Sequence, residues 1–296
     1  MRKLLSVNIA LLVALAIIWG SSYILMKRGL VSFSAIQVSM LRILFAALVL
    51  IPFLPKALKS FSKQDVKYAL VVALLGSGIP SYLYPLAITH VDSSLTGIIN
   101  TLTPLFTMLF GWAFFQFKPT LAKIIGLVIA LVGVALLVVK PGADKLFTLD
   151  FYALIAVLAT VCYGFSSNVL KAKLSHLKAA PLTGLTFALI GPIALIILLS
   201  TDFIEVLQSD PKAWISLMYI AILGMVGTAF ALVLFNYLIQ RTDALYAASV
   251  TFLMPVIAMF WGYLDNEEIG WIHFVGFVLV LIGVFLTNRY KSARSS

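Results

Sequence analysis

The chain has few charged residues, and their scarcity excludes most classes of soluble protein. Only 11% of its 296 residues are charged, whereas 62% are hydrophobic and the mean hydropathy is +1.09. A typical soluble domain has about 25% charged residues and a smaller apolar share. The composition therefore predicts an integral membrane protein.

Several motifs of enzymes and cofactor-binding proteins are missing. No Gly-rich loop ends in Gly-Lys-Ser or Gly-Lys-Thr, so the sequence does not support ATP hydrolysis by this chain. His90, His176 and His273 lie in separate regions without the spacing of metal ligands. The single cysteine, Cys162, excludes an internal disulfide. We expect no catalytic residue, no cofactor and no bound metal.

Long hydrophobic runs fill most of the chain. A hydrocarbon core about 30 Å thick requires roughly 20 apolar residues for each helical crossing. Ten such windows lie near residues 6–26, 34–54, 67–88, 93–114, 121–139, 151–170, 182–200, 213–236, 244–263 and 271–288. A membrane β-barrel would instead require short segments of alternating polarity. The expected fold class is an all-α membrane protein with ten transmembrane helices.

Two stretches, 74–139 and 223–289, repeat one order of glycine, proline and aromatic residues. The equivalent residues are Pro104 and Pro255, Gly126 and Gly276, and Gly133 and Gly283. Each stretch lies in a half with five hydrophobic windows, and an odd number of crossings turns the second half upside down. We therefore predict two inverted five-helix repeats, residues 1–140 and 150–290. Inverted repeats are typical of secondary transporters, whose solute site lies where the repeats meet.

The distribution of Lys and Arg predicts the orientation. With a cytoplasmic N-terminus, fifteen of these residues lie in inside segments and five in outside segments, so both termini are expected in the cytoplasm. The basic residues are spread over six segments, so anionic lipid explains the net charge of +10 and no nucleic-acid partner is expected. We expect a multi-pass protein of the plasma (inner) membrane with the lipid bilayer as its partner.

Two prolines inside the hydrophobic windows mark candidate positions for a solute site. Pro104 frees the carbonyl of Asn100 from its helical hydrogen bond, and Pro255 frees that of Thr251. In a bilayer, such backbone is tolerated where it faces protein or a wet cavity. Asn100 and Thr251 are therefore candidate solute-binding residues, with Pro104 and Pro255 as hinges or gates. Alternatively, both polar side chains only satisfy the kinked backbone or link neighbouring helices.

Other polar and aromatic side chains inside the windows could line a cavity. Trp19, Tyr82, Tyr163 and Asn168 offer the stacking surface and hydrogen bonds that bind an organic solute. Arg42 lies within the second window, where an arginine costs about 2.5–3.5 kcal/mol. Two interpretations of Arg42 stay open: it binds an anionic solute group such as a carboxylate, or it pairs with backbone carbonyls or reaches outward to the interface.

Acidic residues are missing from the predicted spans. Asp92 and Asp243, at equivalent places in the two halves, precede hydrophobic windows and are expected to cap helices. Carriers driven by protons or sodium commonly have an acidic residue inside the membrane. Proton coupling therefore stays open, and a facilitator or an exchanger is an equal alternative.

A resemblance to a known family covers nearly the whole chain. The run Ile18-Trp19-Gly20-Ser21-Ser22-Tyr23, the pair Leu41-Arg42 and the repeated Pro and Gly pattern resemble EamA-type permeases of the drug/metabolite transporter superfamily. The resemblance implies ten helices, a central cavity bounded by both halves and transport, often export, of small organic metabolites. EamA-type permeases often have a Gly-Glu pair after the fourth helix, whereas this chain has Gln116 in that region.

The leading hypothesis is a secondary transporter, expected to export small organic metabolites such as amino acids or amphipathic compounds. It would work by alternating access through a cavity between the repeats. The alternative is a lipid-handling or scaffold membrane protein whose polar groups only hold helices together. The identity of the solute and the oligomeric state stay open.

Overall fold

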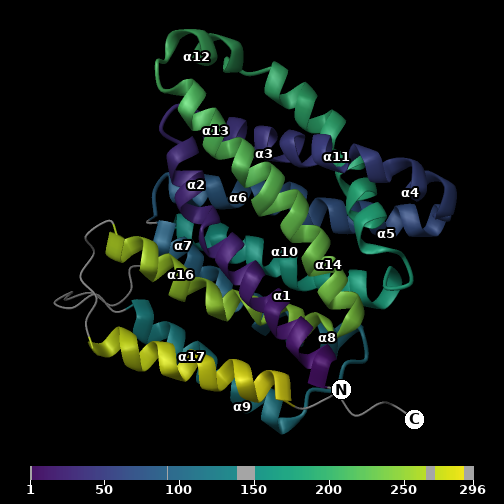
Figure 1. Ribbon diagram of the computed structural model, residues 1–296, viewed down its shortest axis with the longest axis vertical. Coiled ribbons are helices and arrows are strands. Elements are labelled where there is room, and N and C mark those ends of the chain that lie inside the picture. The colour runs from purple at the N-terminus through teal and green to yellow at the C-terminus, as the bar shows by residue number, and fades with distance from the viewer. Residues whose placement is uncertain (1, 92, 139–150, 265–270, 290–296) are drawn as a thin grey trace.

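The computed structural model describes residues 2–91, 93–138, 151–264 and 271–289, which form helices and short connections without any β-strand (Figure 1). The first half contains α1 (Arg2–Gly20), α2 (Ser22–Gly29), α3 (Ala35–Leu50), η1 (Ile51–Phe53), α4 (Leu54–Ser60), α5 (Lys63–Ala73), η2 (Leu74–Gly78), α6 (Ile79–Ile88), α7 (Ser93–Ile99), η3 (Asn100–Leu102), α8 (Thr103–Phe114) and α9 (Leu121–Val138). The second half contains α10 (Phe151–Lys173), α11 (Ala179–Leu199), α12 (Phe203–Ser209), α13 (Ala213–Gly224), η4 (Met225–Phe230), α14 (Ala231–Arg241), α15 (Ala244–Ala248), α16 (Val250–Leu264) and α17 (Trp271–Arg289). The expected all-α class is confirmed for the described residues.

Seven helical segments are long and apolar enough to cross a membrane, and three more apolar helices are shorter. The seven are Val7–Gly29, Ala35–Lys59, Lys63–Ile88, Thr96–Phe114, Phe151–Lys173, Ala179–Leu199 and Ala213–Arg241. The three shorter helices are Leu121–Gly133, Ala244–Ile257 and Val278–Thr287. Each of these segments coincides with one of the ten windows expected from the sequence. The chain is therefore a multi-pass membrane protein, while ten crossings and the inverted repeat stay predictions.

The two halves are interleaved rather than side by side. Helix α10 of the second half packs against α5, α6 and α8 of the first half, and α1 packs against α14 and α16. Helices α3 and α11 form a further contact between the halves (Figure 1). Because each half supplies helices to the other's interior, the centre of the bundle is shared by both.

Two spans widen into π-helical turns, which the sequence analysis did not predict. Segment η2 begins at residue 74 and η4 at residue 225, so their starts are 151 residues apart, the offset of the two prolines. The hydrogen bonds of a π-helix reach one residue further than those of an α-helix, and π-turns occur frequently at functional sites. The matching positions of η2 and η4 direct attention to the centres of these two spans.

Helices α9 and α17 lie side by side at one edge of the molecule (Figure 1). Gly133 is required there, because a Cβ atom on it would lie 2.7 Å from both the carbonyl oxygen of Gly276 and the backbone nitrogen of Val280. Glycines seven residues apart, such as Gly126 and Gly133, fall on one helical face and are typical of close helix contact, but the sequence does not identify the partner helix. The structure shows that the contact joins the last helix of one half to the last helix of the other.

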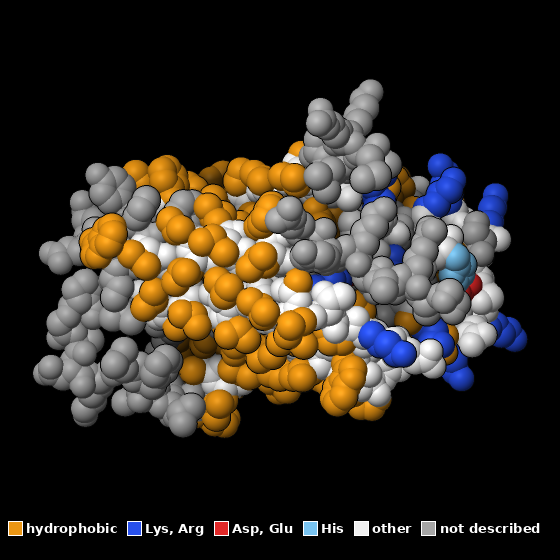
Figure 2. Space-filling view, turned by 90° about the horizontal axis from the view of Figure 1, so that it is seen from below, with side chains coloured by type: hydrophobic (Ala, Val, Ile, Leu, Met, Phe, Trp, Pro, Cys, Tyr) orange, Lys and Arg blue, Asp and Glu red, His pale blue; other side chains and the backbone are white. Residues whose placement is uncertain are grey.

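The surface has the polarity expected of a membrane protein. Large apolar side chains are strongly exposed on many helices; Ile196, for example, is 70% exposed and Trp271 77%. Figure 2 shows hydrophobic side chains over the middle of one face and Lys and Arg side chains gathered at one end. A soluble monomer rarely exposes so large an apolar surface, so lipid is its natural environment.

Candidate functional site

A cavity lies at the centre of the bundle, where helices from both halves meet. Its lining comes from α1, α2, α3, α5, η2, α6, η3 and α8 of the first half and from α10, α11, η4, α14, α15 and α16 of the second. Helices α9 and α17, which pack on each other at the edge, contribute none of the described lining residues. The cavity matches the central, shared cavity that the family resemblance implied.

The structure brings five of the seven sequence-predicted binding residues together in this cavity. These five are Trp19, Arg42, Asn100, Tyr163 and Thr251. Tyr82 is half-buried and is not among the lining residues, although its neighbour Ser81 is. Asn168 is buried and also lies outside the lining. Its side-chain nitrogen donates hydrogen bonds to the carbonyls of Thr107 (2.8 Å) and Gly164 (2.9 Å), which fastens α10 to α8.

Asn100 connects three elements around the cavity. Its side-chain oxygen accepts hydrogen bonds from the hydroxyl groups of Tyr84 (2.7 Å) and Thr103 (2.9 Å). Its side-chain nitrogen lies 3.7 Å from the sulfur of Met254, which belongs to the second half. Sulfur is a weak acceptor, so the amide nitrogen keeps hydrogen-bonding capacity for another group.

Thr251 is a lining residue from the second half. It is only 4% exposed, and its hydroxyl donates a hydrogen bond of 2.9 Å to the carbonyl of Ala248 in the preceding helix. The hydroxyl oxygen can still accept a hydrogen bond from a solute. Thr251 therefore fits both interpretations, solute binding and satisfaction of the kinked backbone, because its hydroxyl bonds a local carbonyl and the residue also lines the cavity.

The two prolines lie beside breaks in the helices. Pro104 lies at the start of α8, directly after the 3-10 turn that contains Asn100. Pro255 lies inside α16, whose separation from α15 occurs at Ser249, six residues before the proline. The fourth and ninth spans are therefore both interrupted on the N-terminal side of their proline.

Aromatic rings form much of the apolar wall. Tyr84 and Tyr163 stack with centroids 5.9 Å apart, and Trp19 meets Phe235 edge to face at 5.0 Å. The indole nitrogen of Trp19 also donates a hydrogen bond of 2.9 Å to the carbonyl of Gly227 in η4. These contacts hold the ring planes in fixed positions, as a site that stacks on an organic solute requires.

Arg42 is buried in the cavity wall at 7% exposure. Its Nε donates a hydrogen bond of 2.6 Å to the hydroxyl oxygen of Thr228 in η4, and that hydroxyl donates to the carbonyl of Leu223 at 2.9 Å. The guanidinium group therefore neither reaches outward to the interface nor bonds a backbone carbonyl. The π-turn of the second half holds the arginine of the first half in place.

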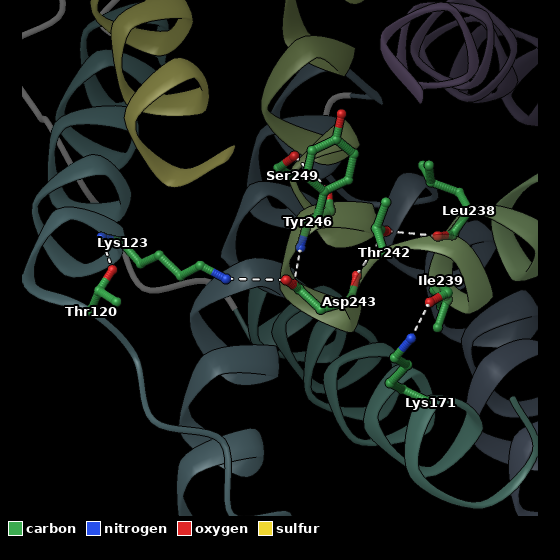
Figure 3. Close-up of polar contacts among 9 residues, drawn as sticks. All are labelled: Thr120, Lys123, Lys171, Leu238, Ile239, Thr242, Asp243, Tyr246 and Ser249. Atoms are coloured by element: carbon green, nitrogen blue, oxygen red, sulfur yellow. Dashed lines mark hydrogen bonds and ion pairs between the residues drawn. The ribbon is translucent and has the colours of Figure 1, made fainter. Parts of the chain in front are cut away.

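A second polar cluster, the lysine–aspartate junction, consists of Lys123, Lys171 and Asp243 (Figure 3). Lys123 of α9 is 2% exposed, and its Nζ lies 3.1 Å from a carboxylate oxygen of Asp243 in the other half. Lys171 donates to the carbonyls of Ile239 and Gln240 at 3.1 and 3.2 Å. The pair of Lys123 and Asp243 joins the two halves. Lys171 links α10 to the C-terminal end of α14, where Ile239 also lines the cavity.

Asp243 also fulfils the capping role expected of it. Its side chain accepts a hydrogen bond of 2.7 Å from the backbone nitrogen of Tyr246 at the start of α15 (Figure 3). Its predicted counterpart Asp92 lies outside the described residues. One carboxylate thus starts a helix and pairs with a buried lysine from the other half.

Sequence reasoning missed several contributors to the cavity. Ser81, Thr228 and Phe235 all line it but were not among the candidates. A usable signal was present, because the glycines of Gly76-Ser77-Gly78 and of Gly227-Thr228 lie at equivalent places in the two halves. Glycine inside a long apolar run marks a departure from regular helix or a close approach, and both departures face the cavity.

The lining of the cavity offers groups suited to noncovalent binding. No Asp, Glu, Lys or His occurs among the described lining residues, and the described chain holds no group of three His, Cys, Asp or Glu that could bind a metal ion. The lining combines aromatic and aliphatic walls with a few hydroxyl groups, two amides and one guanidinium. Such a site recognises a small organic molecule by stacking and a few polar contacts.

Comparison with known proteins gives one consistent match. The model of the EamA-like transporter family matches the chain twice, over residues 7–139 and over residues 150–289. A solved crystal structure aligns with 98% of this chain and 99% of its own at a TM-score of 0.73. Because only 13% of the residues are identical, that structure supports the fold alone.

Three similar proteins cover nearly the whole chain. The uncharacterized transporter YoaV of Bacillus subtilis is 23% identical over 96% of this chain and 97% of its own. The probable terminal-alkyne amino-acid exporter of Streptantibioticus cattleyicolor is 23% identical over 96% of this chain and 94% of its own. The uncharacterized inner membrane transporter YedA of Escherichia coli K12 is 24% identical over 95% and 90% of the two chains.

Proposed function

Because the chain belongs to the EamA-like transporter family, we propose that it is a secondary transporter that carries small organic metabolites through the central cavity by alternating access. The observation that carries this proposal is the position of the cavity between the two halves of the chain, with polar residues from each half in its wall. A site between repeats is typical of secondary transporters. Amino acids and amphipathic compounds fit its mixture of aromatic and polar groups.

In the proposed mechanism the two halves, related as inverted five-helix repeats, rock against each other around a bound solute. Asn100, Thr251, Trp19 and Tyr163 hold the solute, and the helix breaks beside the two prolines act as hinges. The ion pair between Lys123 and Asp243 joins the two halves in the described state. We propose that these two residues separate when the halves move against each other.

The proposed direction is export across a plasma (inner) membrane with both termini in the cytoplasm. The end of the molecule that gathers Lys and Arg (Figure 2) would face the cytoplasm under the positive-inside rule. One similar protein is named as an exporter and another as an inner membrane transporter, which supports the same direction and membrane. Since no acidic residue occurs among the described lining residues, a facilitator or exchanger fits as well as proton coupling.

A lipid-handling or scaffold role was the alternative from the sequence. A polar opening on the lipid-facing side of the bundle would support such a role. The cavity instead lies among helices of both halves, and each half contributes polar residues to its lining. The location of the cavity therefore favours solute transport.

Substitution of Asn100 and Thr251 tests this proposal. In proteoliposomes, counterflow of an amino-acid mixture is expected to fall about tenfold for Asn100→Leu, because a buried hydrogen-bonding group is lost. Thr251→Val keeps the side-chain shape and is expected to reduce counterflow less. Thr89→Val is the matched control, because Thr89 is exposed and bonds only the local residues Leu86 and His90.

The decisive comparison is made with protein that is folded and inserted to the wild-type level. Undiminished counterflow in both Asn100→Leu and Thr251→Val would refute the assignment of these residues to the solute site. A loss of counterflow in Thr89→Val of the same size would indicate that the fold, and not the site, had been disturbed.

A further inference from the structure

The wall of the cavity contains one charged side chain among its described lining residues, Arg42. The two ion pairs of the described chain, Lys123 with Asp243 and His176 with Asp65, both lie elsewhere. The positive charge of Arg42 is therefore not neutralised by any acidic residue in the described part of the protein. A buried arginine is normally paired, because an unpaired charge away from water is costly.

Most hydrogen-bonding capacity of Arg42 is also unused. A guanidinium group has five N–H donors. One of them is bound to Thr228, and another lies 4.0 Å from the sulfur of Met26, which is a weak acceptor at a long distance. The remaining donors form no hydrogen bond with any described residue. The bond to Thr228 fixes the plane of the guanidinium group and leaves its outer edge available.

A second donor in the same cavity lacks a partner. The hydroxyl of Ser81 is 1% exposed, lines the cavity and has no hydrogen-bond partner in the structure. A buried hydroxyl without a partner costs about 1–3 kcal/mol. The amide nitrogen of Asn100 has two N–H groups, and one of its contacts is the weak acceptor sulfur of Met254 at 3.7 Å. The cavity thus has an excess of hydrogen-bond donors and a single positive charge.

We propose that Arg42 forms a carboxylate subsite and that the transported solute is a monoanion or zwitterion whose carboxylate pairs with this guanidinium group. The inference rests on the transport function proposed above. A planar carboxylate matches the two parallel N–H groups at the edge of a guanidinium group. A single charge in the wall favours a monoanion over a dianion such as a phosphate monoester.

The apolar part of the solute then faces the aromatic wall. Tyr23, Tyr84 and Tyr163 line the same cavity as Arg42. A carboxylate at Arg42 therefore directs the rest of the solute along the stacked Tyr84 and Tyr163 rings. An amine without a carboxylate finds no acidic partner among the described lining residues and is repelled by Arg42, so it is excluded.

Three probes of similar size test the subsite: phenylacetate, 2-phenylethanol and phenethylamine. Their binding is measured by calorimetry on the full-length protein in nanodiscs. Phenylacetate is expected to bind tightest. Arg42→Gln is expected to raise the Kd of phenylacetate at least about tenfold, because a charge-assisted pair of hydrogen bonds is lost. Arg42→Lys keeps the charge but not the planar fork and should give an intermediate value. Ser81→Ala should raise the Kd slightly.

The matched control is Arg28→Gln, which removes an equal charge at an exposed position outside the cavity lining. Its Kd for phenylacetate is expected to equal that of the wild type. Equal binding of all three probes, binding of none, or an unchanged Kd in Arg42→Gln would each overturn the carboxylate subsite. In those cases, counterflow of neutral or cationic solutes would support the transport function without the carboxylate subsite. Absence of counterflow for every solute would reject both the transport function and the subsite.

Discussion

Replacement of Gly133 by leucine is expected to destabilise the protein by about 3 kcal/mol, a large overpacking effect for one residue. A Cβ atom at this position would lie 2.7 Å from two backbone atoms of α17 and would also be too close to the Cβ atom of Leu279. Backbone cannot move aside as a flexible side chain can, so α9 and α17 must separate. The measurement is the thermal unfolding of the purified protein, where the loss should appear as a lower midpoint.

Ala135→Leu is the matched control for this prediction. Ala135 lies two residues further along α9 and is exposed, so the added side chain meets lipid. Its unfolding midpoint should stay at the wild-type value. If Gly133→Leu unfolds at the same temperature as Ala135→Leu, the close approach of α9 to α17 does not hold in the membrane protein.

Asp243→Asn is expected to lower the unfolding free energy by about 2 kcal/mol. Asparagine caps a helix as well as aspartate does, so the hydrogen bond to the nitrogen of Tyr246 is retained. The substitution removes only the charge opposite Lys123, which is 2% exposed and would be left unpaired. Breaking a fully buried pair costs about 3–5 kcal/mol. The side chain of Asp243 is 31% exposed, so solvent reduces the loss.

A double-mutant cycle separates the ion pair from other effects of the substitution. Lys123→Met removes the unpaired charge, so the double variant should recover most of the stability lost in Asp243→Asn. Lys118→Met, at an exposed lysine five residues earlier, serves as the control and should be neutral. Independent, additive losses from Lys123→Met and Asp243→Asn would contradict a direct interaction between the two halves at this point.

The spans of this protein could be predicted from the sequence because each depends on local composition. The window 93–114 matches the combined range of α7, η3 and α8, and the windows at 121–139 and 151–170 begin at the first residues of α9 and α10. Length and hydropathy were sufficient, since a bilayer imposes one thickness on every crossing helix. The glycine pairs also predicted a close contact, although not which helices it would join.

The composition of the site could be predicted only in part, because it depends on which helix faces which. Tyr82 and Asn168 had suitable chemistry but are not among the lining residues of the cavity, and Asn168 instead bonds the carbonyl of Thr107. The bond from Arg42 to Thr228 joins residues 186 positions apart, and no local pattern specifies it. Likewise, the structure buries Lys123 against Asp243, 120 residues further along the chain, and no local pattern specifies this contact.

The π-turns have a consequence for how this chain tolerates changes in length. Each hydrogen bond of η2 and η4 encloses one residue more than a bond of an α-helix does. Deletion of one residue from η2 would leave an ordinary α-helix. The side chains after the turn, such as those of Ser81 and Tyr84, would then keep their direction. The same deletion in a regular span such as α10 would rotate every later side chain by about 100°. Insertions and deletions among relatives should therefore accumulate at these two turns, at matching places in the two halves.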